Sequence, residues 1–123
     1  MTDTNKSVTI SVDLKKNRIR FYKSMLQLLD NPKYVQLLVN PNNKCVAIKG
    51  ITTKTPGDQA QRIRPKSFTE EHDYELYSMS FVHKLFDIVG NLERNRTYRL
   101  RGTIVKSHCM AIFSLETLTP IEM

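Results

Sequence analysis

Alternation of apolar and polar residues marks the first predicted element. Residues 7–12 alternate with a period of two, which is typical of a strand with one buried face, and a second short strand is expected at 19–22. The apolar residues of 23–30 cluster as they do in a short helix. Asn31-Pro32 ends this helix, because a residue that precedes proline is displaced from helical backbone angles. Two apolar stretches around the polar break at 40–44 then predict a β-hairpin.

The same order of elements is predicted in the second half of the chain. A short strand is expected at 74–77, followed by a helix that Ser78 or Ser80 can cap and that ends at Gly90, which suits a left-handed backbone. Four apolar residues have the i, i+4, i+7, i+8 spacing of one buried helix face: Phe81, Leu85, Ile88 and Val89. A second hairpin is expected around the polar break at 106–108.

The two halves also share short sequences at a fixed spacing. Tyr34 is followed eleven positions later by Cys45-Val46-Ala47-Ile48, and Tyr98 is followed eleven positions later by Cys109-Met110-Ala111-Ile112. The hairpins therefore align at an offset of sixty-four. The helical patterns align at an offset of sixty, with Phe21 matched to Phe81. One such unit cannot bury its own apolar face, whereas two packed together can, so we interpret the halves as structural duplicates.

We therefore predict an α+β fold in a single domain, residues 1–123. Repeat one covers about 7–50, a connecting loop covers 51–73, and repeat two covers about 74–115. Each repeat has the element order β-α-β-β, and the two repeats are expected to form one pseudo-symmetric, barrel-like domain.

Parts of the first half resemble a known family. Asn17-Arg18-Ile19-Arg20-Phe21, a short helix that ends at Leu28-Leu29, and a hairpin that ends with Val46-Ala47-Ile48-Lys49 are similar to the AbrB-type DNA-binding domain of transition-state regulators and MazE-like antitoxins. The resemblance implies a barrel in which two units exchange hairpins, and it implies that a chain with two copies forms this barrel within itself. It also implies that basic residues of the barrel contact DNA. Where the family usually opens its helix with proline, this chain has Tyr22-Lys23-Ser24.

The net charge of the chain, +7, gives a first indication of a partner. A basic excess attracts polyanions such as nucleic acid or an anionic membrane. The apolar runs are too short to span a bilayer, and the N-terminal residues lack the apolar segment of a secretory signal, so a cytoplasmic location is expected. The two cysteines are too few for a disulfide framework and are expected to remain thiols.

The first candidate binding surface is a basic segment near the N-terminus. It has five cations within nine positions: Lys15, Lys16, Arg18, Arg20 and Lys23. Such residues neutralise phosphates and release counterions, and by the resemblance this is where AbrB-like domains place their DNA-contacting residues. Arg18 and Arg20 are expected to be free to point outward from one strand face. The alternative is a charged sheet edge that discourages strand-to-strand aggregation.

Two other basic groups are weaker candidates. A loop that can reach along a nucleic-acid backbone, or that is simply a charged surface connector, contains Arg62, Arg64 and Lys66. A row of arginines suits phosphates, a partner's carboxylates or a local pairing with Glu93 or Glu116, and consists of Arg94, Arg96, Arg99 and Arg101. The five tyrosines can stack on bases, but their place in alternating strands favours a structural role at the edge of the core.

No feature of the sequence indicates catalysis. The four glycines form neither a phosphate-binding loop nor a nucleophile elbow, and the three histidines belong to no acid–base or metal motif. His108 adjoins Cys109, but neighbours on a strand point to opposite faces, which is wrong for a shared metal ion. We therefore expect no enzyme activity, no catalytic residue, no metal site and no cofactor.

The predicted function is that of a small DNA-binding regulatory protein that acts on transcription through a basic surface. Double-stranded DNA is the expected partner, and a membrane is not; the oligomeric state, monomer or homodimer, stays open. Residues 70–75 are rich in carboxylates that would repel phosphate, so the DNA surface is expected to be asymmetric. The alternative is a non-enzymatic protein-binding accessory module, an adaptor or inhibitor that engages an acidic partner.

Overall fold

Antiparallel strands predominate in the structure and are accompanied by two α-helices. The computed structural model describes residues 7–53, 60–65 and 73–121. The fold class is α+β, as the sequence predicts. In chain order the elements are β1 (Ser7–Asp13), β2 (Arg18–Tyr22), α1 (Lys23–Leu28), β3 (Tyr34–Asn40), β4 (Cys45–Ile51), β5 (Gln61–Arg62), β6 (Arg64–Pro65), β7 (Asp73–Tyr77), α2 (Met79–Val89), β8 (Thr97–Val105), the 3₁₀ turn η1 (Lys106–His108), β9 (Met110–Ser114), the 3₁₀ turn η2 (Leu115–Thr117) and β10 (Thr119–Pro120).

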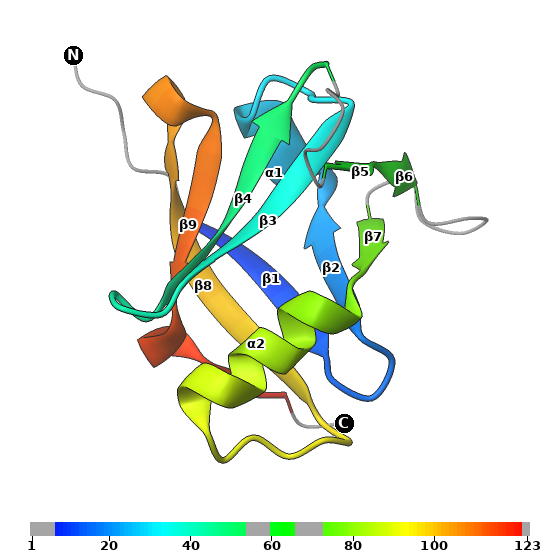
Figure 1. Cartoon of the computed structure of the whole chain (residues 1–123). Helices are drawn as coiled ribbons and strands as arrows, with labels where there is room; N and C mark the ends of the chain where they lie inside the picture. Colours follow the sequence, from blue (N-terminus) through cyan, green and yellow to red (C-terminus); the bar gives the residue numbers. More distant parts are fainter. Residues whose placement is uncertain (1–6, 54–59, 66–72, 122–123) are drawn as a thin grey trace.

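The strands form one antiparallel sheet that nearly closes on itself. Its order is β5-β3-β4-β9-β8-β1-β2-β7-β6, and β10 pairs with β8. β5 and β6 are the two ends of this order, yet only Ile63 separates them along the chain, so the two ends of the sheet meet. The sheet is therefore barrel-like, with α2 across one end and α1 toward the other (Figure 1). β5 and β6 lie within 51–73, the segment predicted to connect the repeats.

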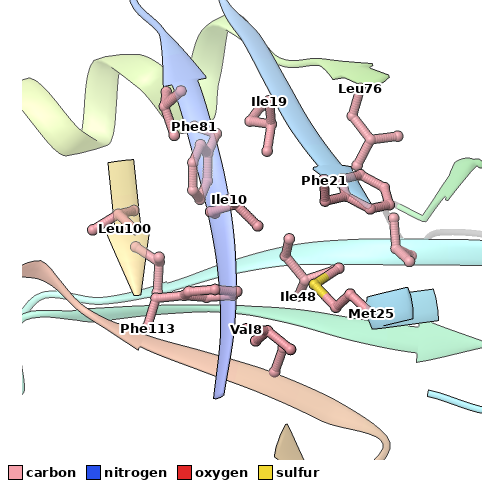
Figure 2. Packing of buried hydrophobic residues seen from close by; sticks show 14 of the residues in the cluster. Val8, Ile10, Ile19, Phe21, Met25, Ile48, Leu76, Phe81, Leu100 and Phe113 are labelled. Carbon is pink, nitrogen blue, oxygen red and sulfur yellow. The ribbon is translucent and has the colours of Figure 1, made fainter. Parts of the chain in front are cut away.

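Apolar side chains from most elements fill the interior of the barrel. The alternation predicted for β1 is confirmed, because Val8, Ile10 and Val12 are 8%, 1% and 0% exposed. Figure 2 shows side chains from β1, β2, α1, β4, β7, α2, β8 and β9 in one interior, among them Phe21 and Phe113. Each large apolar side chain that is fully buried stabilises the fold by about 1.5–3 kcal/mol relative to an exposed one. The core is thus shared by both halves of the chain.

The second helix has the start and the end that its sequence predicts. Of the two serines proposed as caps, Ser78 is the one used, because its Oγ accepts a hydrogen bond from the backbone N of Phe81 at 3.2 Å. The helix ends at Gly90, whose φ of 99° is in the left-handed range that glycine adopts without a steric penalty. Phe81, Val82 and Leu85 form its buried face.

The first helix is shorter and has no side-chain cap at its N-terminus. It spans six residues, and the chain leaves the helical conformation at Asp30 and Asn31, which have φ values of 66° and 49° before Pro32. The predicted match of Phe21 with Phe81 is wrong, because Phe21 lies in strand β2 and Phe81 lies in the first turn of α2. Both phenylalanines are buried, but in elements of different type.

The predicted equivalence of the two cysteines is also wrong. Cys45 is the first residue of β4, whereas Cys109 precedes β9 and has a left-handed φ of 51°. The buried side chains of the two strands match at an offset of sixty-five rather than sixty-four, with Val46 and Ile48 in β4 and Ala111 and Phe113 in β9. A shift of one residue exchanges the two faces of a strand, so an alignment of the hairpins at sixty-four would set these buried side chains against outward ones.

Candidate nucleic-acid interface

The candidate interface is the outer face of the neighbouring strands β8, β1, β2 and β7. On β1 the inward core residues alternate with Thr9, Ser11 and Asp13, which face outward. Ser11 is the cross-strand partner of Arg20 on β2 and also of Arg99 on β8. The register therefore places a small hydroxyl residue between two arginines on the same face of three adjacent strands.

Two of the predicted DNA-contacting residues are engaged in an ion-pair network on this face. Arg18 Nη2 lies 3.0 Å from Asp13 Oδ2, and Arg18 Nη1 lies 3.6 Å from Glu75 Oε2. Arg20 Nη2 donates to the same oxygen of Glu75 at 3.0 Å. Ile19 and Phe21 are fully buried on the opposite face, so both arginines do point outward as predicted. They are not free, however, because two carboxylates balance their two charges.

Glu75 remains ionised because of these neighbours. Burial of its carboxyl group alone would raise the pKa, since desolvation disfavours the charged form. The hydrogen bond from Arg20, the charges of Arg18 and Arg20, and a hydrogen bond from the Tyr77 hydroxyl at 3.3 Å outweigh this effect. The pKa of Glu75 is consequently lower than that of an ordinary glutamate. The network joins β1, β2 and β7 across the outside of the sheet.

The cations that carry uncompensated charge lie next to this network. Arg99 and Arg101 are exposed on β8. Tyr98, which precedes Arg99, and Leu100, which lies between the two arginines, are buried, as the alternation predicts. Within the described parts of the chain, neither guanidinium group has a carboxylate within ion-pair distance. Their positive charge is therefore available to a partner.

The turn between β1 and β2 adds two lysines to this end of the surface. Lys15 and Lys16 are exposed, and Asp13 Oδ1 accepts hydrogen bonds from their backbone N atoms at 3.1 and 3.2 Å. The backbone N of Leu14 donates to the carbonyl of Arg96 at 3.1 Å, which joins the turn to the segment that leads into β8. The lysine side chains are thus held at the same end of the sheet as the start of β8.

The remaining predicted site residues do not all belong to this surface. Lys23 is exposed at the first position of α1, next to the end of β2. Arg62 lies in β5 and pairs with Tyr34 of β3, away from β1 in the sheet order. Arg64 lies in β6, opposite Glu75 in the backbone register, and Lys66 lies outside the described residues.

The other two arginines of the second half have local partners. Arg96 Nη1 donates to Glu93 Oε1 at 3.1 Å, which is one of the local pairings considered from the sequence. The guanidinium of Arg94 lies 4.7 Å from the centre of the Phe86 ring, within the range of a cation–π contact. Arg99 and Arg101 are therefore the members of the row that remain available, and their alternation with buried residues is the signal that marks them.

A shallow hollow of about 290 Å³ opens on the candidate interface. Ser11 lines this hollow, and the strand register places it between Arg20 and Arg99. The hollow is lined by Thr9, Ile10, Ser11, Asp13, Arg18, Arg20, Tyr22, Thr97, Arg99 and Ile121. Among the described residues, the polar part of this lining consists of hydroxyl groups, guanidinium groups and one carboxylate, a composition that favours an anion.

A different outer face, formed by β3, β4 and β9, is apolar. Leu38, Ala47 and Ile112 are cross-strand neighbours in one row, and Met110 lies beside them. Ala47 is only 8% exposed although it does not belong to the core cluster, because its neighbours on the outside cover it. Leu38 is 38% exposed. The barrel thus has a basic outer face and an apolar one.

No family model matches the chain, and comparison with curated proteins and with solved structures gives no match either. In the described part of the chain, no helix is long and apolar enough to cross a membrane. Over the same residues, histidine, cysteine and carboxylate side chains form no group of three or more that could hold a metal ion.

Proposed function

We propose that this protein is a DNA-binding regulatory protein that contacts the phosphate backbone through its basic outer face. We define this face by Lys15, Lys16, Arg20, Arg99 and Arg101. The observation that carries the proposal is the exposure of Arg99 and Arg101 on β8 without a carboxylate partner in the described residues. Cations held on a rigid sheet neutralise phosphates and release condensed counterions, which drives binding with little dependence on base sequence.

Because of the ion-pair network, Arg18 and Arg20 have different roles on this face. Arg18 is bound to Asp13 and Glu75, so it contributes mainly to the joining of β1, β2 and β7. Arg20 shares Glu75 and keeps part of its guanidinium toward the hollow that Arg99 also lines. The proposed surface is asymmetric, because the segment before α2 contributes Glu75 rather than a cation. Glu75 does not stand unpaired on this face, since it is bound to Arg18 and Arg20.

We also propose that the barrel is a duplicated unit with exchanged hairpins, the arrangement that the AbrB-type resemblance implies. β1 lies between β2 of its own half and β8 of the other half, and β5 and β6 stand between β3 and β7 in the same manner. β4 pairs with β9 and β2 pairs with β7, which are the corresponding elements of the two halves. In this interpretation β5 and β6 are the shortened counterpart of β1, so the second unit begins near residue 60.

The experiment is a fluorescence-anisotropy titration of labelled duplex DNA at 50 and 200 mM salt. Wild-type protein is expected to bind at low salt and to lose affinity steeply at high salt, as phosphate contacts require. Replacing Arg99 and Arg101 together by alanine should weaken binding and flatten the salt dependence by roughly one unit of slope per lost contact.

The matched control removes two cations from elsewhere on the same chain. Lys33 and Lys84 are exposed and lie outside the basic outer face, so the Lys33→Ala and Lys84→Ala double variant has the same net charge as the arginine variant. Equal losses in the two variants would show that only net charge matters and would contradict the assigned surface. Affinity no better than millimolar at low salt would remove the proposal altogether.

The apolar outer face favours a second candidate, a protein-binding accessory module. Leu38, Ala47 and Ile112 form a row beside Lys49, and none of the outward positions of β3, β4 and β9 is acidic. This composition fits an acidic segment with one apolar side rather than a second copy of this basic chain. An acidic amphipathic peptide should bind wild-type protein and should not bind Ile112→Asp, whereas DNA affinity should be equal in both. Loss of DNA affinity in Ile112→Asp would contradict the separation of the faces.

A further inference from the structure

The hollow on the basic outer face combines three features that a general basic surface does not have. It is concave, with a volume of about 290 Å³, whereas nonspecific phosphate contact needs no concavity. Its floor is Ser11, a small residue between two arginines on neighbouring strands. Its rim carries an apolar side chain, Ile121, which follows β10 and whose backbone N donates to the carbonyl of Thr97 at 2.9 Å.

Arg20, which lines this hollow, has one hydrogen-bond donor without an acceptor among the described residues. Its Nε atom is buried, while Nη2 of the same group is bound to Glu75. A buried N–H of a charged group without an acceptor is unfavourable. The Arg20 side chain as a whole is 32% exposed, and an anion in the hollow can contact it there. The Arg99 guanidinium and the Ser11 hydroxyl line the same space and supply further donors.

The negative charge around the hollow is already balanced. Asp13 is the only carboxylate among the described residues of the lining, and its Oδ2 is bound to Arg18 at 3.0 Å. Its Oδ1 accepts the two backbone N–H groups of the β1–β2 turn at 3.1 and 3.2 Å. Since Arg99 has no carboxylate partner in the part of the chain that the structure describes, an anion that enters the hollow meets net positive charge from these residues.

We infer that this hollow is a seat for one phosphoryl group, held by the side chains of Arg99 and Arg20 and by the Ser11 hydroxyl. A phosphoryl group is tetrahedral and offers several acceptor oxygens, which matches donors that converge from three strands. The inference deepens the proposed function, on which it rests when the phosphate belongs to DNA. The same chemistry would seat a free phosphate or the phosphate of a small ligand, and the experiment separates these sources.

The first arm is a titration of ¹⁵N-labelled protein with inorganic phosphate at constant ionic strength and pH 7.5, with chloride as the reference anion. Saturable shifts of the Ser11, Arg20 and Arg99 amide signals at one phosphate per chain are expected. Arg99→Gln should weaken phosphate binding about tenfold, since it removes a charge-assisted donor. Arg101→Gln, two positions along the same strand face but outside the hollow, should change phosphate affinity less than about twofold.

A second variant keeps the result interpretable if Arg99→Gln unfolds the protein. Ser11→Val removes the hydroxyl and adds bulk to the floor, and a β-branched residue suits a strand, so the fold should persist while phosphate binding is lost. Unfolding curves of all three variants confirm that the native state is compared. Phosphate binding that is unchanged in both Arg99→Gln and Ser11→Val, or absent in wild-type protein, overturns the seat.

The second arm uses the duplex DNA titration in the presence of phosphate. If phosphate and DNA compete, and Ser11→Val weakens both, the seat holds a backbone phosphate. If phosphate binds as described and DNA does not bind, the seat stands with a free or small-ligand phosphate, and the proposed DNA function fails. If DNA binds with wild-type affinity to Ser11→Val and phosphate does not bind, the seat is wrong while the proposed function stands.

Discussion

Lys44 and Cys109 occupy the same position in two different hairpins. Both have left-handed backbones, with φ values of 52° and 51°, and each backbone N donates to the carbonyl three residues earlier. The carbonyl of Cys109 accepts from the N of Gly50 at 2.8 Å, and the carbonyl of Lys44 accepts from the N of Leu115 at 3.0 Å. Each acceptor lies beside one hairpin turn, and each donor lies near the end of the last strand of the other hairpin, Gly50 within β4 and Leu115 just after β9, so the two hairpins anchor one another reciprocally.

The two cysteines should therefore not form a disulfide in the folded protein. The carbonyl of Cys109 accepts a hydrogen bond from the backbone N of Gly50, near one end of β4. Cys45 is at the other end of β4, five residues before Gly50. Five strand residues span roughly 17 Å, whereas a disulfide requires Cα atoms within about 7 Å. After mild oxidation of native protein, mass spectrometry should find two free thiols. Oxidation in concentrated urea is the positive control, since an unfolded chain can close this loop, and a disulfide formed under native conditions would contradict the register of β4.

Gly102 should be the least replaceable glycine of the described chain. A Cβ atom at this position would lie 2.2 Å from the carbonyl oxygen of Ile112 and 2.6 Å from Cδ2 of Phe113, inside the β8–β9 pair. Neither the backbone nor a fully buried ring can move away cheaply, so Gly102→Ala should reduce the free energy of unfolding by about 3 kcal/mol or more. Urea unfolding monitored by circular dichroism measures this change.

Gly90→Ala is the matched control for that substitution. A Cβ at Gly90 meets nothing within 4 Å, so the only cost is its φ of 99°, which should be about 1–2 kcal/mol. A loss in Gly102→Ala that is smaller than the loss in Gly90→Ala would show that β8 and β9 are not packed as described.

Local pattern was sufficient to predict the strands, hairpins and caps that depend on neighbouring residues. The alternation of Val8, Ile10 and Val12 and the positions of Ser78 and Gly90 are examples, and all agree with the structure. The shared cysteine pattern predicts that Cys109 corresponds to Cys45, whereas the backbone angle and hydrogen bond of Cys109 match those of Lys44. The type of a residue therefore does not determine its position in a turn, whereas its backbone hydrogen bonds do.

The candidate site depends more strongly on contacts that no local pattern contains. Sequence could place Arg18 and Arg20 on one outward face, but it could not show that Glu75, fifty-five residues beyond Arg20, binds both. The alternation of β8 predicts that Arg99 points outward, but it does not predict the position of Arg99 beside Ser11, which arises only when β8 pairs with β1. Two-residue strands such as β5 have too few positions for a periodic pattern, so the sequence predicts a loop throughout 51–73.

Ser78 should contribute to stability through its capping bond. Ser78→Ala removes the acceptor for the backbone N of Phe81 and should reduce the free energy of unfolding by about 1 kcal/mol. Ser80→Ala serves as the control because Ser80 is exposed and its Oγ makes a single side-chain contact, to Ser78 Oγ at 3.4 Å. Its effect should stay within about 0.5 kcal/mol. Equal losses in the two variants would contradict Ser78 as the cap.

Glu75 should make the fold sensitive to acid. Its pKa in the folded protein is lowered from the ordinary glutamate value: burial acts to raise it, and the Arg20 hydrogen bond with the charges of Arg18 and Arg20 overcomes burial. For a group with a lowered folded-state pKa, the stabilisation is fully present above the unfolded-state pKa and is lost as the pH falls through the folded-state pKa. At neutral pH the wild-type protein should thus be more stable than Glu75→Gln, and this difference should shrink below the usual glutamate range.

The measurement is a series of urea unfolding curves for both proteins between pH 7 and pH 3. Glu116→Gln is the control, because Glu116 is exposed and forms no ion pair within the described residues, so its difference from wild type should be small at every pH. Protonation of Glu75 removes its ion pairs with Arg18 and Arg20, which join β7 to β2 in addition to the backbone pairing of these strands. If the difference in free energy of unfolding between wild type and Glu75→Gln widened on acidification, burial and not the two arginines would dominate the pKa of Glu75.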